Sequence, residues 1–243
     1  MTATGGSLSR EERFGAALVE IEQALDWVQL GEVYCHEGGA DFFDDDQLAA
    51  QREAALHFAS DIGERLGSRP KGRSLYVGAG VAELAPILCD AILLRREVAV
   101  VALPGPESRE LNRALEQAEG RLGFALPRWS TKPLRSLKRD GFDHLWMVSV
   151  LNDPEAFPAL SKRLYERGSP PARSVGRDRK AASELLDEAF RRLDYPAVFA
   201  TSEEELPLLE AAARSRGLNV QLAEAGRLSP IVGDVVRHGW IVR

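Results

Sequence analysis

From Ser74 onward, short apolar runs alternate with segments of helical periodicity, and this alternation constrains the fold more than any other feature. Strand–helix–strand units of this length imply parallel strands joined by right-handed crossovers. One run, His144–Leu151, is apolar on both faces, as the middle of a parallel sheet requires. The remaining predicted strands are Leu75–Val77, Val98–Leu103, a weak one at Leu122–Leu126, Ala197–Ala200, Leu218–Leu222 and Val235–Val242.

Two helices are predicted before the first strand. Apolar residues at steps of four and three predict a first helix over Phe14–Val28. A second apolar stripe predicts a helix over Leu48–Leu66, and Arg69–Gly72 then ends it. We therefore divide the chain into an N-terminal helical segment, residues 1–72, and an α/β domain, residues 73–243.

The composition of the chain excludes several classes of protein. A net charge of -6 argues against a nucleic-acid protein that relies on overall positive charge, although a local basic patch stays open. No apolar run approaches the roughly 18 residues that span a bilayer, and the N-terminus lacks the apolar core of a signal peptide. Two cysteines are too few for a disulfide framework. We expect a cytoplasmic protein without membrane partners and leave open a homo-oligomer.

The segment Ser74–Leu84 joins a strand to a helix through the turn Gly78-Ala79-Gly80. Gly78 suits a backbone conformation that other residues rarely adopt, and Gly80 would let a ligand approach the main chain. The helix that follows offers free N–H groups and the positive end of its dipole. A tight turn without a ligand explains the same residues equally well.

This turn resembles the first motif of class I S-adenosylmethionine-dependent methyltransferases, an acidic residue followed by GxGxG. The end of the chain resembles the same family, with a helix closed by Gly217, a strand, a loop and then Gly233-Asp234 before a last strand. The resemblance implies a Rossmann-like methyltransferase sheet, mostly parallel with an antiparallel last strand, and S-adenosylmethionine as cofactor. It places the cofactor against Gly78, Ala79, Gly80, Ala82, Leu103, Pro104 and Glu107.

Two positions depart from the pattern of that family. Tyr76 stands where an acidic residue precedes the glycines, and Leu103–Pro106 stands where a carboxylate usually holds the ribose of the cofactor. Losing that carboxylate removes charge-assisted hydrogen bonds worth about 1.5–3 kcal/mol each. Glu107 follows three residues late and could replace it by reaching back from the start of its helix.

The sequence Asn152-Asp153-Pro154 follows the strand His144–Leu151, at the end of the sheet where ligands bind in this architecture. The resemblance implies that Asn152 and Asp153 orient a methyl acceptor, with catalysis mainly by positioning. The alternative is that these residues form a turn that caps the next helix.

Two stretches of the chain are basic, residues 128–139 and residues 161–180. The second carries seven lysines and arginines against two acidic residues, and Pro170-Pro171 predicts a mobile loop there. Such loops could hold a small anionic substrate or an RNA backbone, and a solvated loop without a ligand is the alternative. The basic residues of the second stretch are Lys162, Arg163, Arg167, Arg173, Arg177, Arg179 and Lys180.

The acidic loop between the two N-terminal helices contains Cys35, His36 and Glu37 beside several aspartates. It lacks the ligand spacing of zinc and calcium sites, so no metal is expected.

The sequence therefore supports two hypotheses. The first is a methyltransferase that acts on a small anionic molecule or RNA, with the helices of residues 1–72 covering the substrate. The second is a non-catalytic protein of the methyltransferase fold that serves as a binding or assembly module, as the residues at Tyr76 and Pro104 indicate. A nucleotide-binding Rossmann protein with another cofactor is a third, and the missing acid after the second strand counts against NAD.

Overall fold

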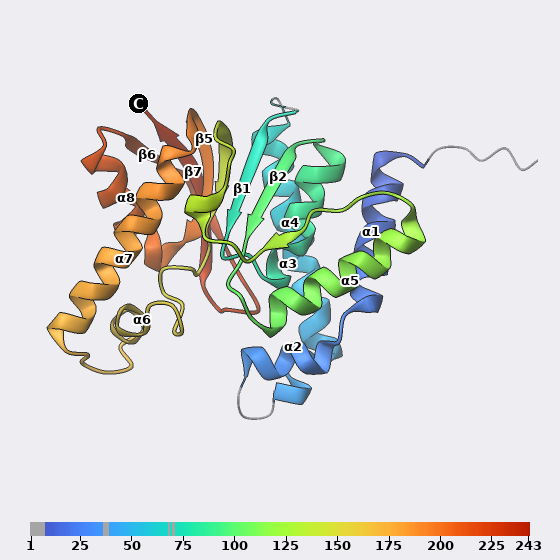
Figure 1. Ribbon diagram of the computed structural model, residues 1–243, viewed down its shortest axis with the longest axis horizontal. Helices are drawn as coiled ribbons and strands as arrows, with labels where there is room; N and C mark the ends of the chain where they lie inside the picture. Colours follow the sequence, from blue (N-terminus) through green and yellow to red (C-terminus); the bar gives the residue numbers. More distant parts are fainter. Residues whose placement is uncertain (1–7, 36–38, 68, 70) are drawn as a thin grey trace, which may run out of the picture.

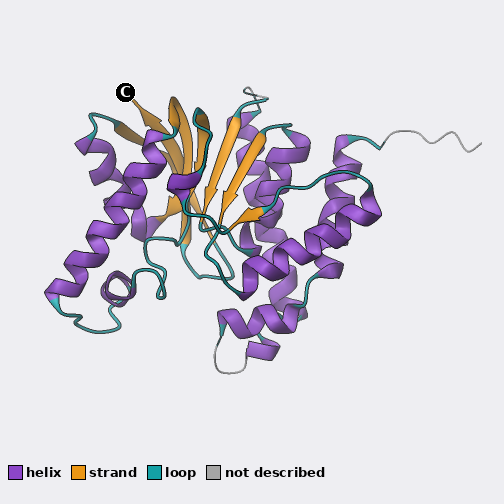
Figure 2. Cartoon of the chain, viewed as in Figure 1, coloured by secondary structure: helices purple, strands orange, loops and turns teal. Residues whose placement is uncertain are grey.

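The computed structural model describes residues 8–35, 39–67, 69 and 71–243. Within them a seven-stranded sheet lies between two layers of helices (Figures 1 and 2). Its strand order is β3-β2-β1-β4-β5-β7-β6, and β7 runs antiparallel to both of its neighbours. This mostly parallel sheet with an antiparallel last strand confirms the predicted Rossmann-like methyltransferase fold. The strands are β1 (Arg73–Val77), β2 (Glu97–Val101), β3 (Trp129–Ser130), β4 (Phe142–Trp146), β5 (Leu193–Ser202), β6 (Asn219–Leu228) and β7 (Val235–Val242).

Two of the predicted strands differ from those in the structure. The strand expected at Leu122–Leu126 is wrong, because helix α5 (Pro106–Leu122) continues to its first residue and Gly123, at a φ of 70°, ends the helix. Strand β3 instead begins at Trp129. Strand β4 ends at Trp146, and the chain turns away at Ser149, where φ is 56°, so the second half of the run at 144–151 is not a strand.

One layer of helices includes the N-terminal segment, which packs against the sheet. Ile62 of α3 lies in the same hydrophobic cluster as Tyr76 of β1 and Trp146 of β4. Helix α3 therefore shares a core with the α/β domain, and the division of the chain into two domains at residue 72 stays a prediction. The helices of this layer are α1 (Arg10–Ala24), α3 (Asp45–Leu66), α4 (Leu84–Leu88) and α5.

The first predicted helix, Phe14–Val28, is wrong as a single helix. Helix α1 ends at Ala24, and Leu25 has an extended backbone. The Asp26 side chain then caps α2 (Trp27–Tyr34) by accepting the Gln29 N–H at 3.0 Å. A short turn, η1 (Gly39–Asp41), follows, whereas His36, Glu37 and Pro70 lie outside the described residues.

The second layer covers the opposite face of the sheet. Leu186 of α7 and Leu209 of α8 pack against Leu145 and Phe199 in a separate cluster. The mobile loop expected over residues 161–180 is wrong for most of that stretch, because both ends of it are helical and only residues 165–171 connect them. The elements of this layer are η4 (Leu134–Ser136), α6 (Pro158–Leu164), α7 (Ala172–Arg191), η5 (Glu203–Glu205) and α8 (Leu206–Ser215). No helix in the described part of the chain is long and apolar enough to cross a membrane.

A buried carboxylate joins β1 and β4 to the helical layer. Asp90, in the π-helical turn η3 (Cys89–Leu93), is inaccessible to solvent. Its Oδ2 accepts the Tyr76 hydroxyl at 3.0 Å and lies 3.0 Å from His144 Nδ1, and Arg96 Nε lies 3.9 Å from its Oδ1. Tyr76, which stands where the family has an acidic residue, is thus a structural donor.

We predict that Asp90→Ala lowers the free energy of unfolding by about 2–5 kcal/mol, because Tyr76 and His144 lose their shared buried acceptor and buried Arg96 keeps only Asp143 as a nearby carboxylate. Urea denaturation measures the change. The matched control is Glu53→Ala on the exposed side of α3, where the effect should stay within about 0.5 kcal/mol. Equal effects in the two variants would contradict the assignment.

Candidate functional site

The glycine turn lies at the carboxyl end of β1, where the resemblance placed the cofactor. Gly78 has a φ of 71°, and its N–H donates to the Val101 carbonyl at 2.7 Å. A Cβ at Gly78 would lie 2.5 Å from Val150 Cγ2. The space beside this glycine is therefore filled by a side chain from the loop after β4.

Gly80 faces two side chains of the protein itself. Its N–H donates to Glu83 Oε2 at 2.8 Å, and the next N–H, that of Val81, donates to Glu107 Oε1 at 2.8 Å. The Tyr34 hydroxyl donates to the same Glu107 oxygen at 2.5 Å. A Cβ at Gly80 would lie 2.5 Å from that oxygen and 2.8 Å from the Tyr34 hydroxyl. Both N–H groups that the turn offers are thus bonded to carboxylates of the chain.

Burial raises the pKa of both carboxylates at the turn. For Glu83, burial is the main cause and raises the pKa to about 7, although the Gly80 N–H opposes the shift and Glu107 adds to it. Burial also raises the pKa of Glu107, and the bonds from Tyr34 and Val81 oppose it. The turn therefore holds two acids at a position where an anionic ligand would otherwise bind.

The other residues expected to hold the cofactor fall into two groups. Ala79 is buried, and its carbonyl accepts the Trp129 indole N–H at 2.9 Å, while Ala82 is half-buried against the core. Leu103 is 51% exposed, and Pro104 is also exposed. The structure thus brings Glu107 to the glycines and leaves Leu103 and Pro104 in solvent.

S-adenosylmethionine does not fit the residues around the turn as the structure arranges them. Glu107 and Tyr34 occupy the approach to Gly80, and Val150 occupies the approach to Gly78. Binding of the cofactor against these glycines would require the three side chains to move. Its contacts with the predicted residues stay a prediction.

A second polar cluster lies at the carboxyl end of β4, around the two predicted catalytic residues. Asn152 is buried, and its Nδ2 donates to Asp234 Oδ2 at 2.8 Å and to the Tyr165 hydroxyl at 2.7 Å. The Tyr165 hydroxyl in turn donates to Asp234 at 2.7 Å. Asp153 Oδ1 accepts the N–H groups of Glu155 and Ala156 at 2.9 and 2.6 Å. Asp153 therefore forms a turn cap, and Asn152 ties this loop to the start of β7.

Sequence reasoning missed Glu205, which organises the same loop. Its carboxylate accepts the N–H groups of Ser149 and Leu151 and, at 3.0 Å, the Thr201 hydroxyl. Burial raises the pKa of Glu205. These bonds hold Ser149 at its positive φ, which costs a non-glycine residue about 1 kcal/mol. The spacing of Ser202 and Glu205, which is that of a capping box, is the one sequence signal that could have indicated it.

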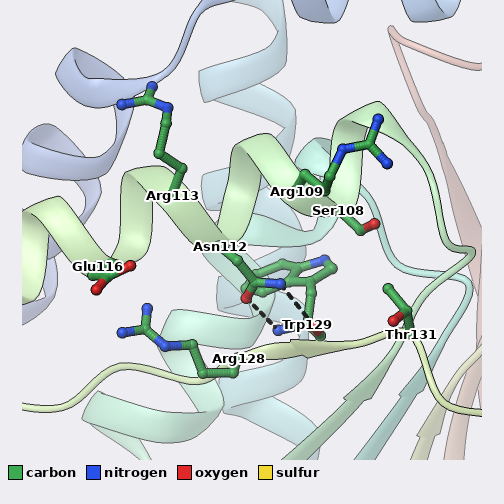
Figure 3. Close-up of a pocket in the computed structure, with 8 residues that line it drawn as sticks. All are labelled: Ser108, Arg109, Asn112, Arg113, Glu116, Arg128, Trp129 and Thr131. Carbon is green, nitrogen blue, oxygen red and sulfur yellow. Dashed lines mark hydrogen bonds between the residues drawn. The ribbon is translucent and has the colours of Figure 1, made fainter.

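A shallow hollow of about 430 Å³ lies between α5 and β3, and Trp129, which lines it, donates its indole N–H to the Ala79 carbonyl of the glycine turn (Figure 3). Several of its polar groups have partners in the chain. The Asn112 side chain bonds both the N–H and the carbonyl of Trp129, Arg113 bonds Glu110, and Arg128 bonds Glu119. Asn112 thus substitutes for a neighbouring strand at the edge of the sheet. Among the described residues, no group of three or more candidate ligands could hold a metal ion.

No protein-family model and no curated protein matches the sequence. Solved structures match at low identity. TrmN from Thermus thermophilus is 18% identical over 76% of this chain and 48% of that one, with a TM-score of 0.47, so the chain spans about half of its length. A putative sarcosine dimethylglycine methyltransferase from Galdieria sulphuraria is 12% identical over 88% and 96% of the two chains, with a TM-score of 0.49. A SAM-dependent methyltransferase from Aquifex aeolicus is 14% identical over 82% and 100%, with a TM-score of 0.45.

At such identities these matches concern the fold alone. The strand order of the chain itself places it in the class of Rossmann-like methyltransferase folds, in which the last strand of the sheet is antiparallel. The contacts around the glycine turn, and not the matches, bear on its function.

We predict that Glu83 makes stability fall as pH rises from about 4.5 to about 7. Unfolded Glu83 loses its proton near 4.5 and folded Glu83 near 7, so between these values the folded state binds the extra proton. The variant Glu83→Gln lacks this pH-dependent contribution to stability. The stability of the wild type relative to Glu83→Gln should therefore drop by on the order of 3 kcal/mol between pH 4.5 and about pH 8, measured by urea denaturation. Parallel pH profiles would contradict the prediction, and exposed Glu53→Gln serves as control.

We also predict that Gly80 and Glu107 are energetically coupled. Gly80→Ala should lower the free energy of unfolding by about 1–3 kcal/mol, because the added methyl group overlaps Glu107. In the Glu107→Ala background the same change should cost at least about 1 kcal/mol less. A double-mutant cycle by chemical denaturation gives this difference, and additive effects would show that Glu107 does not occupy the turn.

Proposed function

We propose that this chain is a non-catalytic protein of the methyltransferase fold that serves as a binding or assembly module. The observation that carries the proposal is the closure of the glycine turn by Glu83, Glu107 and Tyr34. The N–H groups that would bind a cofactor instead stabilise two buried carboxylates of the chain.

The magnitudes favour this proposal over an enzyme that binds S-adenosylmethionine at the turn. Hydrogen bonds to charged groups contribute about 1.5–3 kcal/mol each, so freeing Glu107 from Val81 and Tyr34 costs about 3–6 kcal/mol. Binding at millimolar affinity yields only about 4 kcal/mol. The cost of opening the turn would therefore offset most of the binding free energy of a cofactor. In addition, Leu103 and Pro104 stand where a carboxylate would hold its ribose.

The predicted catalytic residues support the same proposal. Asn152 is held by Asp234 and Tyr165, and Asp153 caps a turn, so both side chains are engaged within the protein. The methyltransferase hypothesis, with a small anionic acceptor or RNA, requires these side chains to leave those partners. It is the alternative that the following experiment tests.

We predict that neither S-adenosylmethionine nor S-adenosylhomocysteine gives a binding isotherm or a thermal shift at about millimolar ligand, the affinity range in which roughly 4 kcal/mol is gained. Isothermal titration calorimetry on the full chain is the measurement. The matched sample is Glu107→Ala combined with Tyr34→Phe, which removes the groups that cover Gly80. Saturable one-to-one binding to the wild type, abolished by Gly80→Arg, would overturn the proposal.

A further inference from the structure

We propose that the face formed by α6 and the first half of α7 binds the phosphodiester backbone of a nucleic acid. This inference rests on the proposed function: the protein is a binding module, and its partner binds to this face and not to the glycine turn. It names the class of partner and the residues that contact it.

Helix α7 presents a basic stripe. Arg173, Arg177 and Lys180 recur at steps of four and three, which places them on one side of a helix. All three are exposed, and the Arg177 and Lys180 side chains are 72% and 80% exposed. The opposite side of α7 is buried through Val175, Ala182, Leu186 and Phe190. The packing of the helix therefore fixes the stripe toward solvent.

The neighbouring helix α6 extends this stripe into a surface. Asp178 of α7 is buried, and its Oδ2 accepts the Ala159 N–H of α6 at 2.7 Å, which fixes α6 against α7. Helix α6 carries Lys162 and Arg163, both exposed. The first basic stretch does not join this surface, because the Leu137 carbonyl that follows η4 accepts from Arg192 at the opposite end of α7 from Arg173.

The connection between α6 and α7 is also held in place. The Arg167 guanidinium lies 4.9 Å from the centre of the Tyr165 ring, at cation–π distance. The Tyr165 hydroxyl is bonded to Asp234 at the start of β7. One arginine of this segment is thus positioned beside the carboxyl end of the sheet.

Most of these cations lack an acidic neighbour. Among the described residues, Arg177 pairs with Asp178 and Lys180 with Glu184, the second at 3.8 Å between exposed groups. Within that part of the chain, no carboxylate lies within 4 Å of the charged groups of Lys162, Arg163, Arg167, Arg173 or Arg179. Exposed positive charge therefore gathers on α6 and on the first half of α7, in a protein whose net charge is -6.

The chemistry of this face favours a phosphate backbone over other polyanionic surfaces. Arginines outnumber lysines, and guanidinium groups bind phosphate oxygens in pairs of hydrogen bonds. None of the large apolar side chains that the described chain exposes lies within residues 128–139 or 161–180. A membrane surface or a protein partner would need such apolar groups for insertion or for a buried contact. The expected contact is electrostatic and independent of base sequence.

We expect single-stranded RNA and single-stranded DNA of equal length to bind with an affinity that falls as the salt concentration rises. The ratio of the two affinities shows whether the face prefers ribose or deoxyribose. The test variant is Arg173→Gln, Arg177→Gln and Lys180→Gln together. It should weaken binding at least tenfold at low salt and lower the slope of log K against log salt by about 2, because each lost phosphate contact contributes about 0.7. Fluorescence polarisation with end-labelled oligonucleotides gives both quantities.

The matched control removes the same charge from the opposite helical layer, as Arg52→Gln, Arg109→Gln and Arg121→Gln on α3 and α5. Its slope should equal that of the wild type. Absence of binding at low salt, an equal loss in test and control variants, or equal binding of a labelled poly-glutamate peptide would each overturn the proposal. Cofactor binding in the calorimetry experiment would overturn the proposed function and leave a salt-dependent slope on this face standing, so the two failures are distinguishable.

Discussion

The function that this chain can carry depends on two backbone N–H groups, those of Gly80 and Val81. A strand-to-helix turn leaves such groups without partners inside the backbone, and buried donors need an acceptor. Glu83 and Glu107 supply it. Because each carboxylate is also buried, leaving it without the N–H donor would be as destabilising as leaving the N–H without an acceptor. The pair closes the position that a ligand would otherwise occupy.

The same reasoning applies at the carboxyl end of β4, where buried polar groups bind one another. Asn152, Tyr165 and Asp234 form one set, and Glu205 gathers the backbone of the loop. Such a network fixes the position of the loop after β4 relative to the start of β7, although the two are distant in sequence. The chain therefore has the sheet of the methyltransferase fold, and its interior contacts engage the groups that the family resemblance assigned to a cofactor and an acceptor. A group of exposed basic side chains without a nearby carboxylate lies elsewhere, on α6 and the first half of α7.

Sequence reasoning located the features that depend on local periodicity. The apolar runs identified β1, β2 and β5, and the stripe at Leu48–Leu66 identified α3, because burial on one or two faces imposes a repeat on neighbouring residues. It placed β3 wrongly because that strand is two residues long and carries no repeat. It took residues 172–180 for a loop because charge and small residues dominate there, and burial of Val175 and Ala182 overrides that composition.

By itself the sequence determined most of the alternation of strands and helices and the glycine turn, since these follow from residue spacing or from backbone freedom at glycine, while the antiparallel end of the sheet was implied by the family resemblance. Only the tertiary structure decided what fills that turn. Tyr34, Glu83 and Glu107 come from three separate segments, and no spacing along the chain indicates that they meet. Packing of α2 against α5, and of α5 against the sheet, brings them together, and desolvation of their charges makes the contacts necessary.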